Sequence, residues 1–155
     1  MGTRDRLLPP WLSGYPLPPV ANPLRPGPRL ALVALELFTA LGALYGGGML
    51  VADPTGKRIG FTLQMLERTP FRSYLVPGIV LLAVNGLGML AVALGVLWRW
   101  RHAITASIGV GALLVGWIAV QLLMIGYVSA LQPLMLATGA LIAGTAVLAR
   151  RSSAA

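Results

Sequence analysis

The sequence predicts an all-α membrane protein: an up-down bundle of four transmembrane helices, with a short outer interfacial helix and an extended proline-rich N-terminal arm. Two observations lead to this prediction. Hydrophobic residues make up 57% of the 155 positions and charged residues only 10%, which is unlike a soluble globular chain. The apolar residues also gather into four runs, each about long enough to cross the ~30 Å hydrocarbon core of a bilayer.

Residues 1–29 form the predicted arm, which holds eight of the 12 prolines. Such a density of proline disfavours helix and favours extended backbone. Apolar and aromatic side chains alternate with the prolines, so two interpretations stay open: a tail against lipid headgroups, or a strap along a partner protein. The residues expected to contact such a partner are Trp11, Leu12, Tyr15 and Leu17.

The transmembrane domain is expected over residues 30–149, with spans at about 30–52, 74–98, 103–125 and 131–149. The second and third spans are separated by a short polar break whose tryptophans and arginines are typical of a membrane–water boundary. Its residues are the predicted interfacial anchors Trp98, Arg99, Trp100, Arg101 and His102. Small residues spaced four apart predict close helix packing, as at Ser107/Gly111, Ala112/Gly116 and Ala140/Gly144.

Residues 53–73 form the predicted outer loop. Its start, Asp53-Pro54-Thr55-Gly56, is typical of a type I turn. A phosphate-binding loop is not predicted, because Arg58 stands after Lys57 where that motif requires Ser or Thr. An apolar stripe formed by Ile59, Leu63 and Leu66 instead predicts a short amphipathic helix on the outer surface, ended by Pro70.

The distribution of basic residues predicts the orientation in the cell membrane. With four spans, both termini and the 99–102 turn share one side, and residues 150–155 form a short tail there. That side carries eight basic residues and the other side four: Arg4, Arg6, Arg25, Arg29, Arg99, Arg101, Arg150 and Arg151, against Lys57, Arg58, Arg68 and Arg72. We therefore expect both termini in the cytoplasm.

Glu36 is the first functional candidate, because it lies about 10 Å inside the first span at the helical rise per residue. A carboxylate at that depth is costly unless it is paired or protonated. Candidate partners near the same end are His102, Thr105, Ser107, Thr145 and Arg150. Two roles stay open: a structural acid satisfied by a neighbouring helix or lipid, and a group that handles protons or cations.

Two amides inside the spans are further candidates. Asn85 and Gln121 lie about 20 Å and 27 Å from the same surface, so they are not expected to converge with Glu36 on one substrate. Interhelical hydrogen bonding is the role favoured for both, although the three residues together could line a path.

The amino-acid composition limits which cofactors and partners can be expected. The chain has no cysteine and one histidine, so no metal or haem site built from this chain alone is expected, whereas a lipid or pigment bound within a larger complex stays open. The net charge is +8, but the basic residues lie at the ends of apolar runs. They therefore favour anionic lipid headgroups over nucleic acid as the partner.

The segments Asp53-Pro54-Thr55-Gly56, Thr69-Pro70-Phe71-Arg72-Ser73-Tyr74 and Pro77-Gly78 resemble the loop of small bacterial four-span membrane proteins. The resemblance covers about residues 42–133. It implies a four-helix integral membrane fold and a bacterial inner membrane, and it brings no activity or site residues. No nucleophile–base pair, metal cluster or phosphate loop is evident, so an enzyme is not expected. The sequence favours a structural or accessory subunit of a membrane complex, with a small proton-linked carrier or channel using Glu36 as the alternative.

Overall fold

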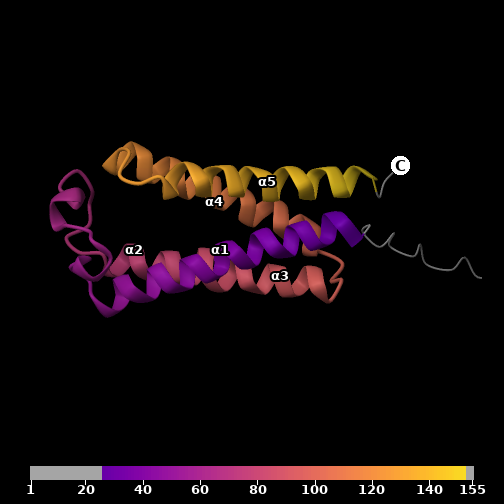
Figure 1. The fold of residues 1–155 in the computed structure, drawn as a ribbon, viewed down its shortest axis with the longest axis horizontal. Helices are drawn as coiled ribbons and strands as arrows, with labels where there is room; N and C mark the ends of the chain where they lie inside the picture. The colour runs from indigo at the N-terminus through magenta and orange to yellow at the C-terminus, as the bar shows by residue number, and fades with distance from the viewer. Residues whose placement is uncertain (1–25, 153–155) are drawn as a thin grey trace, which may run out of the picture.

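A computed structural model describes residues 26–152, and no strand is found in that range. Four helical rods run along the long axis (Figure 1). The first is α1 (Pro26–Ala52). The second joins α2 (Leu75–Val80), the π-helix η5 (Leu81–Gly88) and α3 (Met89–Leu97) end to end. The third and fourth are α4 (Ala103–Ile125) and α5 (Leu131–Ser152). All four rods are long and apolar enough to cross a membrane.

The rods form two helical hairpins that lie side by side. In one, α1 packs along α2, η5 and α3; in the other, α4 packs along α5 (Figure 1). The hairpins meet where α3 contacts α4 and α1 contacts α5. The main buried cluster lies at this junction and takes residues from each rod: Leu32, Ala40, Met89, Leu114, Ile118, Ile142 and Ala146. The core therefore joins the two hairpins into one bundle.

Glycines allow the helices within each hairpin to approach closely. A Cβ on Gly111 of α4 would lie 2.8 Å from the Gly139 carbonyl oxygen and the Ala143 nitrogen of α5. A Cβ on Gly47 of α1 would lie 2.7 Å from the backbone nitrogen of Leu82 in η5. Side chains at these positions would push the backbones apart, so small residues are required there. The expected Ser107/Gly111 ridge thus lies inside the bundle.

Two helix boundaries differ from those expected. Residues 26–29, expected in the arm, are helical in the described part of α1, which therefore includes Pro26 and Pro28 before the expected start at Leu30; proline is tolerated in a first helical turn, where the missing N–H has no helical acceptor. The fourth helix continues to Ser152 instead of stopping at residue 149. Basic side chains in a last turn interact favourably with the negative end of the helix dipole, which is consistent with Arg150 and Arg151 being helical.

The outer loop forms two short 3-10 helices, η3 (Lys57–Ile59) and η4 (Leu63–Leu66), rather than one amphipathic helix. Gly60 separates them with a positive φ of 76°, a conformation that ends a helix. The loop packs on the bundle end through a cluster of Leu50, Leu66 and Tyr74. The Tyr74 hydroxyl donates a hydrogen bond of 2.8 Å to the Thr62 carbonyl oxygen, which fixes the loop to the start of α2.

The start of the loop is held by Asp53. Its Oδ1 accepts hydrogen bonds from the Thr55 hydroxyl at 2.6 Å and the Thr55 N–H at 3.1 Å, and its Oδ2 accepts one from the Arg58 N–H at 3.2 Å. These bonds, the Thr55 hydroxyl first, lower the pKa of Asp53 below its ordinary value. The expected Asp-Pro turn is therefore an Asp-anchored turn that leads into η3.

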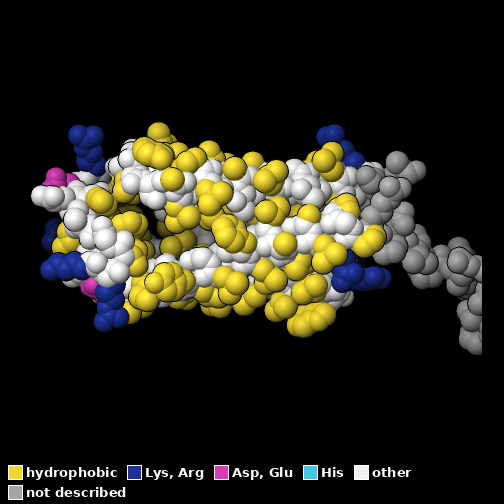
Figure 2. Space-filling view, in the orientation of Figure 1, with side chains coloured by type: hydrophobic (Ala, Val, Ile, Leu, Met, Phe, Trp, Pro, Cys, Tyr) yellow, Lys and Arg dark blue, Asp and Glu magenta, His cyan; other side chains and the backbone are white. Residues whose placement is uncertain are grey.

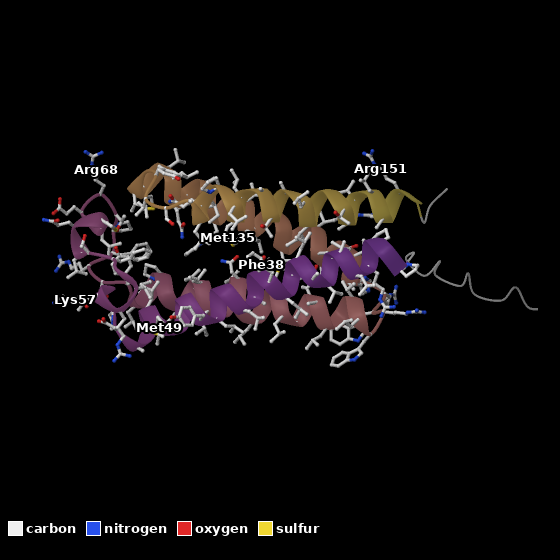
Figure 3. The ribbon with its side chains drawn as sticks, in the orientation of Figure 1. Phe38, Met49, Lys57, Arg68, Met135 and Arg151 are labelled. Atoms are coloured by element: carbon white, nitrogen blue, oxygen red, sulfur yellow. The ribbon has the colours of Figure 1, made fainter. Side chains whose placement is uncertain are left out.

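Charged side chains gather at the two ends of the bundle, and apolar side chains cover the length between them (Figure 2). In Figure 3, Lys57 and Arg68 lie at the loop end and Arg151 lies at the opposite end. This separation is the one a bilayer selects, with charges at the two aqueous faces and apolar side chains between them.

Candidate functional site

Glu36 lies in the middle of the buried face of α1. Leu32 and Ala40, one turn before and after it, belong to the main apolar cluster, and all three side chains are 0% exposed. Helical spacing of four places them on one face, so the position of Glu36 follows from the α1 register. The carboxyl group is therefore in the bundle interior, away from the surrounding lipid.

Neither carboxylate oxygen of Glu36 has a hydrogen-bond partner among residues 26–152. The polar side chain of another helix that acts on this carboxyl group is Ser107 of α4. That hydroxyl donates its hydrogen bond to the Ala103 carbonyl oxygen at 3.1 Å, so it does not satisfy the carboxylate. Of the five partners expected from the sequence, Ser107 is buried, Thr145 is half-buried, and the other three are exposed: His102, Thr105 and Arg150.

Asn85 is buried in η5, with 2% of its surface exposed. Its side-chain Nδ2 has no hydrogen-bond partner within the described part of the chain. The interhelical bond expected for this amide is therefore not formed through that atom. A π-helix segment is often found at functional sites, and here it coincides with the region where α1 and η5 pack most closely.

The third rod contributes two more polar side chains. Gln121 is half-buried on α4. One turn before it, Trp117 packs against the main cluster, and its indole Nε1 is buried without a partner in residues 26–152. Trp117 was not expected as a site residue. Its position in the middle of a span could have indicated a role, because tryptophans of membrane proteins usually lie at the membrane–water boundary, where the indole N–H can reach water.

These polar groups do not form one compact centre. Gly86, next to Asn85, packs against Leu44, which lies eight residues beyond Glu36 on α1. Eight residues correspond to about 12 Å along a helix. Glu36 with Ser107 and Asn85 with η5 are therefore separate polar positions along the bundle, and neither supplies a nucleophile–base pair.

The 98–102 turn closes α3 with a Schellman motif. The Trp100 N–H donates to the Gly95 carbonyl oxygen at 2.9 Å and the Arg99 N–H to that of Val96 at 3.3 Å, with Arg99 at a φ of 58°. The rings of Trp98 and Trp100 are 5.9 Å apart between centroids, and all five residues of the turn are exposed. Exposed tryptophans and arginines at a bundle end are typical of interfacial anchors.

Two positioning residues were missed at the sequence level. Arg29 reaches from α1 to the end of α3, where its Nε donates to the Val96 carbonyl oxygen at 3.1 Å and its Nη2 to that of Leu97. Gln132 closes the turn before α5: its Oε1 accepts from the Val128 N–H at 2.8 Å, and its Nε2 donates to the Gly126 carbonyl oxygen at 3.1 Å. Arg29 thus binds carbonyl groups at the end of α3, and Gln132 binds backbone groups of the link between α4 and α5.

Within residues 26–152 no three metal-ligating side chains lie close enough to hold an ion. The expected arm contacts Trp11, Leu12, Tyr15 and Leu17 lie outside the described residues. No protein-family model, curated protein or solved structure matches this chain. The functional argument therefore rests on the geometry of the bundle.

Proposed function

We propose that this chain is an integral membrane protein that acts as a non-catalytic structural or accessory subunit of a larger membrane complex. The four apolar rods and the charged ends support insertion in a bilayer. The excess of basic residues on one side favours both termini in the cytoplasm. The observation that most supports a role in a complex is the surface of α4 that faces away from the bundle.

Small residues occupy an outward stripe of α4 at Gly109, Ala112 and Gly116. A Cβ at Gly109 or Gly116 would meet no atom of residues 26–152 within 4 Å. The opposite face of the same helix uses Gly111 to pack against α5. Helices that face only lipid gain nothing from glycine, whereas a stripe of small residues lets a second helix approach closely.

The burial of the spans supports the same conclusion. The most apolar window of α4 is 17% buried, against 28% for α5 and 39% for α1. On α5, Ala140 and Gly144 are also exposed, and in the described part of the chain nothing lies within 4 Å of a Cβ on Gly144. The α4–α5 hairpin therefore offers two small-residue faces that no other helix among residues 26–152 covers. In the proposed complex, a helix of another subunit packs on the Gly109–Gly116 stripe.

The test is association in the native membrane. The wild type and the double variant Gly109→Leu/Gly116→Leu are extracted in mild detergent, and complex mass is measured by native electrophoresis and light scattering. We expect the wild type to migrate in a complex of defined stoichiometry and the double variant to migrate as the isolated, folded chain, with a melting temperature no lower than that of the isolated wild-type chain because leucine favours helix more than glycine does. Gly42→Leu on α1 is the matched control, because Gly42 is also exposed and a Cβ there has no described residue within 4 Å. A monomeric wild type, or a double variant that stays in the complex, contradicts the proposal.

A second candidate function is proton-linked transport, and the observation that favours it is the buried, unpartnered carboxyl group of Glu36. Intramembrane acids of this kind serve as proton relays in carriers and pumps. The test is proton flux into liposomes that contain only this chain, followed with an internal pH-sensitive dye. If the chain transports protons, the flux should exceed that of empty liposomes and should be lost in Glu36→Gln. The flux should be kept in Glu67→Gln, the control, because Glu67 is an exposed acid of the loop. Equal flux with and without protein removes this candidate.

A further inference from the structure

Each of the two hairpins is held together by contacts that involve the backbone. In the first hairpin, Gly47 of α1 meets the backbone of Leu82, and the Arg29 side chain binds carbonyl groups at the end of α3. In the second hairpin, Gly111 of α4 meets the α5 backbone. No glycine of residues 26–152 makes such a contact from one hairpin to the other. Each hairpin is therefore expected to move as one unit, and the junction between them is the boundary of that motion.

Packing across this junction is confined to the part of the bundle away from the loop. From α1, Leu32, Val33 and Ala40 belong to clusters that include residues of the second hairpin. Nearer the loop, Leu50 of α1 packs instead with residues of the loop and of α2, which are all parts of the first hairpin. Within residues 26–152, no buried cluster thus joins the two hairpins at the loop end.

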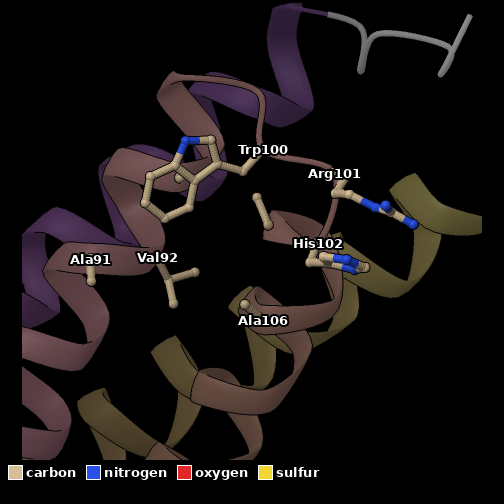
Figure 4. A pocket seen from close by; sticks show the side chains of 8 residues that line it. Ala91, Val92, Trp100, Arg101, His102 and Ala106 are labelled. Carbon is tan, nitrogen blue, oxygen red and sulfur yellow. The ribbon is translucent and has the colours of Figure 1, made fainter.

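Grooves lie at both ends of the junction. At the loop end, a groove of about 330 Å³ separates η4 from the last turn of α4, and we name it the loop-end groove; it is lined by Gln64, Met65, Glu67, Arg68 and residues 122–126. Figure 2 shows the surface hollowed between the hairpins beside the loop. At the opposite end, a groove of about 410 Å³ has Ala91 and Val92 of α3 on one wall and Ala106 of α4 on the other (Figure 4). The hairpins therefore meet along a strip of side chains that ends before the loop.

The 98–102 turn is the one connection between the hairpins in the described part of the chain. Its first half is held on α3, because the Trp100 N–H binds the Gly95 carbonyl oxygen and the Trp100 ring covers Gly95. The loop belongs to the first hairpin, since the Tyr74 hydroxyl binds the Thr62 carbonyl oxygen. The turn is thus in the position of a pivot, and the ends of the hairpins that can separate are those at the loop.

The buried polar atoms without a partner all lie on this junction. Among residues 26–152 they belong to three side chains, Glu36, Asn85 and Trp117. Trp117 packs against the main cluster, and Glu36 is on the same face of α1 as two members of that cluster. Met89, four residues after Asn85, is another member, so helical spacing places Asn85 on the face that meets the second hairpin. Parting the hairpins would let water bind all three groups.

We propose that the two hairpins part at the loop end by rotating about the 98–102 turn, and that water then enters the junction as far as Glu36. We name the two arrangements the closed state and the open state. Packing of the apolar clusters favours the closed state, whereas the loss of water from three polar groups that find no partner opposes it. Glu36 thus raises the population of the open state. This inference concerns the chain alone and depends on neither the partner complex nor proton flux.

Distances between pairs of spin labels, measured by double electron–electron resonance in lipid nanodiscs, test the motion. Cysteines at Gln64 and Leu123, exposed residues on the two walls of the loop-end groove, carry the first pair. Cysteines at Trp98 and Arg150, exposed at the opposite end, carry the control pair. We expect two distance populations for the first pair and one for the control pair. Glu36→Leu should lower the ratio of long to short distances in the first pair about tenfold.

The entry of water is tested by the reactivity of buried cysteines. Asn85→Cys reports the junction, and Ala43→Cys is the matched control, because both residues are buried and Leu44, next to Ala43, packs against Gly86, next to Asn85. Ala43 is one turn before Gly47, so it is on the face of α1 that packs within the first hairpin. A membrane-impermeant anionic methanethiosulfonate, applied on the loop side of sealed vesicles, should modify Asn85→Cys and leave Ala43→Cys unmodified.

Adding Glu36→Leu to Asn85→Cys should slow the modification about tenfold. Removing a negative charge would by itself speed the reaction of an anionic reagent, so slower modification reports fewer open molecules. Equal rates at positions 43 and 85, or modification of position 85 only from the side of the 98–102 turn, would overturn the proposal. If Asn85→Cys does not fold, the spin labels decide, because they are at exposed positions. A single distance for the first pair, or the same two populations with and without Glu36→Leu, would also overturn it.

Discussion

The side chain of Glu36 is buried in an apolar cluster, and this is unfavourable for folding. Its carboxyl oxygens have lost their contacts with water and have no hydrogen-bond partner among residues 26–152. Leaving a buried polar group without a partner costs about 1–3 kcal/mol. An apolar residue of similar size at this position would pack with Leu32 and Ala40 without that cost, so the acid is retained for a reason other than stability of the isolated chain.

Glu36→Leu is therefore expected to stabilise the isolated chain by about 1–3 kcal/mol. The measurement is unfolding in detergent, followed by circular dichroism against temperature and denaturant. Glu67→Leu is the control, because Glu67 is exposed in the loop and its replacement should leave stability within about 0.5 kcal/mol. A loss of stability in Glu36→Leu would mean that the carboxyl group has a stabilising partner, such as a bound water.

Arg99 adopts a backbone conformation that glycine favours. It occupies the position after the end of α3 with a φ of 58°, the only positive value at a residue other than glycine among residues 26–152. For an L-amino acid this region costs roughly 1–2 kcal/mol. The conformation persists because the 95–100 hydrogen bonds require it and because the arginine charge is favourable at the membrane boundary.

Substitutions at Arg99 separate the effect of its backbone conformation on stability from the effect of its charge. Arg99→Gly should be at least as stable as the wild type, whereas Arg99→Val should lose about 1–3 kcal/mol because a β-branched residue is strained there. Arg101→Val removes one charge at a neighbouring residue whose φ is not positive, and should cost less than Arg99→Val. Thermal unfolding of the variants in the same detergent is the measurement. Equal stability of Arg99→Gly and Arg99→Val would contradict the assigned conformation.

At the scale of the helices, the two hairpins depend on close backbone contact more than on large side chains. The α4–α5 contact is closest at Gly111 and Gly139, where a Cβ on either would come within 2.9 Å of the opposing carbonyl oxygen. Lipid tails are as apolar as leucine, so burial of apolar surface gives little drive for association within a bilayer. Close van der Waals packing at such glycines supplies it instead.

Two alanine substitutions on α4 should have opposite effects. Gly111→Ala should destabilise the bundle by about 1–3 kcal/mol, because its methyl group overlaps the α5 backbone. Gly109→Ala, on the outward face, should stabilise it by about 0.5–1 kcal/mol through helix propensity alone. Thermal unfolding of the monomeric chain in detergent measures both. Equal effects at the two positions would show that α4 packs through a different face.

The presence and type of the long helices could be predicted from sequence, because a run of about 20 apolar residues has few alternatives. The bounds of the third rod, Ala103–Ile125, coincide with the expected 103–125. The π-helix within the second rod was not predictable from the pattern, since no local residue demands it and it accompanies tight packing against α1. The loop was predicted as helix from its apolar stripe, but Gly60 divided it into two 3-10 turns.

At the scale of the whole molecule, the candidate site was predictable in part. The burial of Glu36 followed from its neighbours on α1, which are apolar at helical spacing. Its neighbour Ser107 did not follow, because five residues near that end were equally possible until the hairpins were placed side by side. Trp117 was missed for the same reason: a sequence does not show whether a mid-span tryptophan faces lipid or a core. The depth of a residue along its helix can be counted from the sequence, whereas the contacts between the two hairpins depend on how the whole bundle is assembled.

The central claim is that the four rods cross a bilayer in alternating directions, and cysteine labelling tests it most directly. The chain has no native cysteine, so single cysteines at Lys57, Arg101, Leu113, Ala130 and Arg151 can be compared without background. In sealed vesicles treated with a membrane-impermeant maleimide, we predict that positions 101 and 151 react from one side and positions 57 and 130 only from the other. Position 113, in the middle of α4, should not react from either side. Reaction of positions 57 and 101 from the same side, or ready labelling of position 113, would contradict the four-span bundle.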